Sequence, residues 1–166
     1  MNPEEKSETA PAAGAMARGP IPLGKGTIGT FTSPENELER VLVAFRQREA
    51  SIPDLLDALF NSTIFVVTVE PGLAWADNKP QLVPNASLFS MIYPEFNALG
   101  IFTSLSRTLP VSREHAEFRF AVAVPAGEFL SGLTGRFGLI INPYWDMNLQ
   151  WNPEQVERIR AMMRRE

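Results

Sequence analysis

The chain has 166 residues, of which 45% are hydrophobic, and a formal net charge of −4 at pH 7. This size and composition suit one globular domain with a single core. No apolar run approaches the roughly 20 residues that cross a bilayer, and the acidic start lacks the apolar stretch of a secretory signal. Binding to a phosphate backbone needs clustered Lys and Arg, so we expect neither a nucleic-acid nor a membrane partner.

No cysteine occurs in the sequence. This absence excludes disulfides, thiolate nucleophiles and the usual structural zinc sites. It also fits a reducing compartment, and we therefore expect a cytoplasmic protein without a metal or cofactor.

Residues 1–32 are expected to form a flexible N-terminal tail. Pro and Gly are interleaved there and the apolar residues follow no helical or strand period, so the segment buries too little surface to offset its ordering entropy. Ile21, Leu23, Ile28 and Phe31 are nevertheless unusual in a linker, which leaves open that part of the tail packs on the domain or acts as an interaction arm. The ordered domain is expected over residues 33–166.

Two amphipathic helices are expected to open the domain. Ser33 and Pro34 suit the N-cap and first position of a helix, and a second helix is expected to begin near Ser51. The apolar residues of the first helix recur at the spacing of one helical face: Leu38, Val41, Leu42 and Phe45.

The rest of the chain alternates between strands and helices. We expect a central strand over 63–69, a loop over 71–84 that contains Trp75, a hairpin formed by 87–93 and 98–103, and later strands near 118–124, 137–141 and 147–151. A short helix is expected over 126–134, and Asn152 is expected to cap a terminal helix. The chain is therefore predicted to be a single α+β domain, with helices packed on one face of a mainly antiparallel or mixed sheet.

Residues that could perform catalysis are few and scattered. The segment 19–26 approaches the phosphate-binding G-x-x-x-x-G-K-[ST] loop, but Gly26 replaces the required hydroxyl and no strand precedes the loop. His115 is the only histidine, and its polar surroundings predict a surface side chain. Glu35, Glu37 and Glu39 bunch at a helix start, where the helix dipole favours acids. An enzyme is therefore not expected.

Aromatic residues in a turn are the strongest sign of a binding surface. Tyr144 and Trp145 follow Asn142 and Pro143, and exposed Trp and Tyr side chains anchor protein interfaces. The alternative is that Trp145 folds back onto the core. Thr103 and Ser104 end another strand, so the two turns would form one rim if they lie at the same end of the sheet. The candidate interaction surface comprises Phe102, Thr103, Ser104, Asn142, Pro143, Tyr144 and Trp145.

The order of these elements resembles the N-terminal domain of the SseB family, the bacterial "enhanced serine sensitivity" proteins. The similarity runs from about Ser33 to Met163 and rests on the 36–42 helix, the second helix with its following strand, the strand end Gly100-Ile101-Phe102-Thr103-Ser104 and the element Leu139-Ile140-Ile141-Asn142-Pro143. It implies an α+β domain of poorly defined function with no catalytic residue to transfer. The tail and the bulky Tyr144-Trp145 pair depart from the family pattern.

Two functions are consistent with these observations. The first is a non-enzymatic module that binds another protein through the aromatic turn, which predicts an exposed apolar patch near Tyr144 and Trp145. The second is a small-molecule sensor for amino acids or their derivatives, which the family name suggests and which predicts a concave pocket with convergent polar groups. An enzyme would need His115 or an acid in a cleft. Association into a homo-oligomer stays open.

Overall fold

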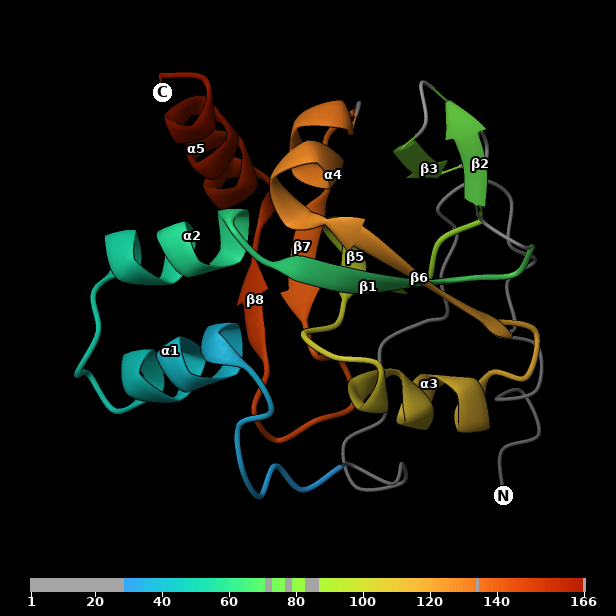
Figure 1. Ribbon diagram of the computed structural model, residues 1–166, viewed down its shortest axis with the longest axis horizontal. Coiled ribbons are helices and arrows are strands. Elements are labelled where there is room, and N and C mark those ends of the chain that lie inside the picture. The colour runs from blue at the N-terminus through green and yellow to red at the C-terminus, as the bar shows by residue number, and fades with distance from the viewer. Residues whose placement is uncertain (1–28, 71–72, 77–78, 83–86, 134, 166) are drawn as a thin grey trace.

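The computed structural model describes residues 29–70, 73–76, 79–82, 87–133 and 135–165 (Figure 1). Its elements alternate between helices and short strands. They are α1 (Glu37–Arg46), α2 (Ile52–Phe60), β1 (Thr63–Thr68), β2 (Leu73–Ala76), β3 (Lys79–Leu82), β4 (Ser90–Ile92), β5 (Asn97–Ile101), the 3₁₀ helix η2 (Ser106–Thr108), α3 (Leu109–Glu114), β6 (Phe120–Pro125), α4 (Ala126–Gly132), β7 (Gly138–Ile141), β8 (Leu149–Trp151) and α5 (Pro153–Met163).

The sheets are antiparallel and mixed, which confirms the predicted α+β class. One sheet has the order β4-β5-β7-β8, in which β5 and β7 run parallel and the other neighbours antiparallel. β1 pairs with β6, and its other edge bonds to the first sheet. There the Phe65 amide donates to the Phe102 carbonyl at 2.8 Å and the Phe89 amide to the Val67 carbonyl at 2.9 Å. β1 is therefore bonded along both edges, as expected of the predicted central strand.

Apolar residues cover both faces of this strand arrangement. One cluster joins side chains of α1, α2, α4 and α5 to one face of the strands, including Leu42, Leu59, Leu130 and Ile141. The other face packs against Val111 of α3. Figure 1 shows α1, α2 and α5 at the left of the strands and α3 at the lower right. Successive residues of a strand point to opposite faces, so Ile140 joins the second cluster and Ile141 the first.

The helix starts follow local capping rules, with one correction. Ser51 and Asn152 form the caps of α2 and α5, each completed by a reciprocal side-chain bond three residues later. The prediction that Ser33 caps the first helix was wrong. Asn36 caps α1 by accepting a hydrogen bond from the Glu39 amide, because the helix begins at Glu37, four residues after Ser33.

Two further segments differ from the predictions. The expected loop over 71–84 contains the hairpin of β2 and β3, in which Trp75 lies opposite Pro80. Proline normally argues against a strand because it lacks an amide donor, which is why the sequence pattern concealed this hairpin. The polar segment before β6 contains α3, whose first turn holds Pro110, a residue favoured there.

The N-terminal prediction is only partly within the described residues. The loop-like segment 19–26 and the rest of residues 1–28 lie outside them, while Gly29 and Phe31 bond to the domain. In the part of the chain that is described, no helix is long and apolar enough to cross a membrane.

Candidate functional site

The two turns identified in the sequence meet at one end of the sheet. Because β5 and β7 are parallel neighbours, their carboxyl ends lie side by side, and the Asn142 amide donates to the Ile101 carbonyl at 2.8 Å. The Asn142 side chain then spans the gap: its Oδ1 accepts from the Thr103 amide and its Nδ2 donates to Thr103 Oγ1, both at 3.0 Å. The two turns therefore lie at the same end of the sheet, which the sequence had left open.

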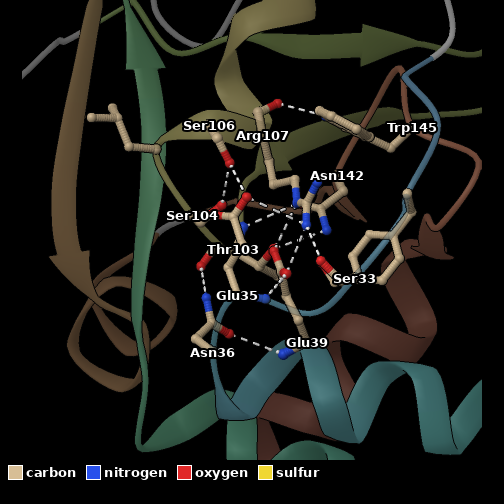
Figure 2. Close-up of polar contacts among 12 residues, drawn as sticks. Ser33, Glu35, Asn36, Glu39, Thr103, Ser104, Ser106, Arg107, Asn142 and Trp145 are labelled. Carbon is tan, nitrogen blue, oxygen red and sulfur yellow. Dashed lines mark hydrogen bonds and ion pairs between the residues drawn. The ribbon is translucent and has the colours of Figure 1, made fainter.

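A buried ion pair lies beside this junction (Figure 2). Arg107 donates from Nε to Glu39 Oε1 and from Nη2 to Glu39 Oε2, both at 2.9 Å. Glu39 is fully buried and Arg107 is 4% exposed. Thr103 Oγ1 donates to Glu39 Oε1 at 2.5 Å, and the Glu35 amide donates to Oε2 at 2.7 Å. Both carboxylate oxygens therefore have two donors, as a buried charge requires.

The surroundings of Glu39 keep it ionised. Burial raises the pKa of its carboxyl, but the hydrogen bonds from Arg107, Thr103 and the Glu35 amide together outweigh burial and lower the pKa from 4.5. The hydrogen bonds to Glu39 in turn raise the pKa of Arg107. The two groups thus hold each other in the charged form, and neither is suited to exchange protons with a substrate near neutral pH.

This arrangement predicts a loss of stability in acid. The pKa of Glu39 is lower in the folded chain than in the unfolded one, so its contribution is complete above pH 4.5 and is lost as the pH falls through the folded pKa. Replacement of Glu39 by glutamine should flatten the fall in unfolding free energy below that pH, measured by urea unfolding across a pH series. An unchanged slope in the Glu39→Gln variant would contradict this prediction.

A strap formed by residues 29–33 covers the guanidinium of Arg107. The ring centroids of Phe31 and Trp145 lie 4.4 and 4.6 Å from the Arg107 guanidinium carbon, a cation–π geometry. Trp145 Nε1 donates to the Arg107 carbonyl at 2.8 Å, and Gly29 bonds to the Tyr144 carbonyl and the Asp146 amide. A Cβ at Gly29 would stand 2.6 Å from the Trp145 ring, so this close approach requires glycine.

The predicted interaction surface is mostly buried. Phe102, Thr103, Ser104, Asn142 and Pro143 are all buried, and Trp145 is half-buried. This inaccessibility contradicts the expected exposed patch and favours the alternative in which Trp145 packs on the core edge.

Tyr144 and His115 form a second internal contact. Tyr144 is 7% exposed and has a φ of 69°, a conformation rare for bulky residues. Its hydroxyl shares a 2.5 Å hydrogen bond with His115 Nε2, and both rings lie against Phe89. The prediction of a surface histidine was wrong, because the ring of His115 is half-buried between these aromatic neighbours.

The predicted site does not contain the two charged residues at the centre of the cluster, Glu39 and Arg107. In the sequence Glu39 belongs to an acidic helix start, but it also lies three residues before Leu42 and so shares the inward face of α1. That position within an apolar face was the available signal. Arg107 lies in a segment with no clear period, and the sequence offered no sign that it is buried.

A groove borders this cluster at Asn36, Thr103 and Ser104, and no residue of the strap lines it. It has a volume of about 800 Å³ and runs between α1, α2, the start of β1 and residues 103–105. Leu38, Val41, Ala58 and Phe65 provide its apolar lining, and Leu105, 57% exposed, stands at its edge. Its acidic residues are Glu37, Asp54 and Asp57, all exposed.

Most polar groups in the groove are already paired within the chain. Asn36 bonds to Thr103 and Glu39, Asp54 to Ser51 and Asp57 to Asn61. Among the described residues, no group of three or more His, Cys, Asp or Glu side chains could hold a metal ion. The groove thus presents apolar surface and negative charge, with few hydrogen-bonding groups left to fix a small polar ligand.

Comparison with known proteins identifies the family. The model of the SseB protein N-terminal domain matches residues 38–158. The chain belongs to the SseB family. This match begins at the second residue of α1 and ends midway along α5. Glu39, Arg107, Thr103 and Asn142 lie within it, while the strap of residues 29–33 precedes it. No curated protein and no solved structure matches the chain.

Proposed function

We propose that this SseB-family domain is a non-enzymatic module that binds another protein through the groove between α1, α2 and residues 103–105. The observation that carries the proposal is an open groove lined by apolar side chains and continued by exposed Leu105. An exposed apolar side chain at the edge of a concave apolar groove is typical of interaction sites. The proposed setting is the cytoplasm of a bacterial cell, with no nucleic acid or membrane as partner.

A protein suits this groove better than a free amino acid does. A free amino acid carries an ammonium and a carboxylate that need specific partners, whereas the groove's polar groups are largely paired with one another. Its volume of about 800 Å³ does fall within the range of small-molecule pockets. An amino-acid-related sensor is therefore the second candidate, and it predicts binding of a small ligand without a protein partner.

The candidate acids and bases favour binding over catalysis. His115 is hydrogen-bonded to Tyr144, whose carbonyl binds Gly29 of the strap. Glu39 is fully buried against Arg107. A general base must reach the proton that it removes, and neither group opens onto the groove. The buried cluster is better explained as the support that fixes the groove's edge at Thr103 and Ser104.

Replacement of Leu105 by aspartate should abolish capture of the partner with little effect on folding. Leu105 is 57% exposed, so its removal costs little core packing, whereas a charge at the groove's edge opposes apolar docking. The measurement is affinity capture from the native cytoplasm followed by mass spectrometry, then titration of the purified partner. Loss of at least about tenfold in affinity is expected for an interface anchor.

The matched control is Met162→Asp, because Met162 is exposed to a similar extent, 53%, on α5, which contributes no residue to the lining of the groove. It should retain the partner. Equal loss in both variants, or none in Leu105→Asp, would contradict the proposed groove. Capture of no protein by wild type, together with a thermal shift on adding amino acids, would favour the sensor instead.

A further inference from the structure

We infer that the groove receives an amphipathic helix of the partner protein, with basic residues flanking its apolar face. This inference rests on the proposed function and specifies the chemistry of the partner at the same site. Three features of the groove lead to it: its charge, the paired backbone of the β1 edge and helix interiors in its walls, and the position of its apolar residues.

The charge of the groove is of one sign. Glu37, Asp54 and Asp57 are exposed along it, and no Lys or Arg occurs among the described residues that line it. Arg40 pairs with Glu37, and no ion pair within the described residues involves Asp54 or Asp57 of α2. Complementary charge steers association and discriminates between partners, so a basic segment is favoured over an acidic one.

The walls of the groove favour a helix over an extended peptide. An extended segment usually binds by adding a strand to an open sheet edge. Phe65, the β1 residue in the apolar lining, offers no such edge, because its amide and carbonyl both bond to Phe102, while the opposite edge of β1 pairs with β6. The interior backbone groups of α1 and α2 bond along their own helices, and only the groups at the helix ends stand outside this pattern. A bound helix needs no partners for its interior backbone, so it is the form that leaves no buried polar group unsatisfied.

The apolar residues of the groove set the spacing of the partner's anchors. Val41 and Ala58 are half-buried on the facing helices, and Phe65 and Leu105 continue the apolar lining toward the sheet. A helix would place apolar residues at positions i, i+3 or i+4, and i+7 along this lining. Lys or Arg beside those anchors would face Glu37 and Asp57.

Two designed peptides of about 14 residues, four helical turns, test this inference directly. Both carry leucine at the anchor positions, and they differ only in having lysine or glutamate at the flanks. Fluorescence anisotropy with the full chain should show binding of the lysine peptide and at least about tenfold weaker binding of the glutamate peptide. Binding of the lysine peptide should also weaken as salt is added, since exposed charges are screened.

The decisive variant is Glu37→Lys/Asp57→Lys, compared with Glu95→Lys/Glu128→Lys. Glu95 and Glu128 are exposed and do not line the groove, so the two variants change the net charge equally. The groove variant should lose about tenfold in affinity for the lysine peptide and gain affinity for the glutamate peptide. The control should change both affinities far less.

Equal losses in the two charge variants would mean that only net charge attracts the peptide, and would overturn the inference. Equal binding of the two peptides, or binding that Leu105→Asp leaves unchanged, would also overturn it. The proposed function is tested separately from this inference. If neither peptide binds, the inference is overturned, but a partner captured by wild type and lost in Leu105→Asp would still support the groove as a binding site. Concentration-dependent dimerisation abolished by Leu105→Asp would identify a second copy as the occupant and overturn a heterologous helix.

Discussion

Replacing Glu39 by leucine is expected to lower the free energy of unfolding by about 3–5 kcal/mol, the usual cost of removing one partner of a buried ion pair. The variant leaves Arg107, 4% exposed, without the carboxylate that accepts two of its hydrogen bonds. Thr103 Oγ1 and the Glu35 amide lose their acceptor as well. Urea unfolding monitored by tryptophan fluorescence measures this loss, because Trp145 contacts the Arg107 guanidinium.

The double variant Glu39→Leu/Arg107→Met should be less destabilised than the sum of the two single variants, since it buries no unpaired charge. The expected coupling is up to about 3 kcal/mol, as found for contacting residues. The matched control is the exposed pair of Glu37 and Arg40 on the same helix, with an Nη1–Oε2 distance of 2.5 Å. Its removal should cost less than about 1 kcal/mol. Comparable losses for the exposed and buried pairs would show that burial does not set the strength of the Glu39–Arg107 interaction.

Glu37 and Arg40 are three residues apart, whereas Glu39 and Arg107 are 68 apart. The same difference in separation along the chain explains which parts of the structure the sequence predicted. The start of α2 near Ser51 and the cap of α5 at Asn152 were predictable because each cap is completed three residues further along the chain. Strand positions were predictable where β-branched or alternating apolar residues run for several positions, as in β1 and β6. Caps and strand patterns depend only on residues close together in sequence, so they can be recognised from one amino-acid sequence.

The interior of the candidate site depends on residues far apart in sequence. Arg107 meets Glu39 across a separation of 68 residues, and Thr103 meets Asn142 across 39. The sequence identified Thr103 and Asn142 because strand ends and turns mark them locally. It did not predict burial of Glu39 or Arg107, because the desolvation of a charge is offset only by a partner that the fold brings near.

The groove was also beyond prediction for a physical reason. Its lining comes from α1, α2, β1 and the segment after β5, and Leu105 differs from a core leucine only in what surrounds it. Tyr144 and Trp145 suggested a surface because they occupy a turn, but turn residues are buried when a strap and a neighbouring helix cover them. The covering residues Gly29 and Phe31 belong to the segment expected to be a flexible tail.

Replacement of Asn142 by alanine is expected to cost about 3 kcal/mol of unfolding free energy, from buried groups left unsatisfied and from backbone strain. Asn142 is fully buried with a φ of 52°, a left-handed conformation that asparagine tolerates better than alanine. The variant also leaves the Thr103 amide without its acceptor and Thr103 Oγ1 without its donor. Urea unfolding gives the loss, and amide hydrogen exchange at Thr103 should become faster.

Asn142→Gly and Asn142→Asp separate the two contributions. Glycine accepts the positive φ without strain, so Asn142→Gly should be about 1 kcal/mol more stable than Asn142→Ala while losing the same side-chain bonds. Aspartate has the shape of asparagine but cannot donate to Thr103 Oγ1, and its negative charge would be buried beside the hydroxyl that serves Glu39. It should therefore be the least stable of the three. Equal stability of the glycine and alanine variants would exclude strain, whereas a mild effect of aspartate would show that the junction between β5 and β7 does not depend on the amide.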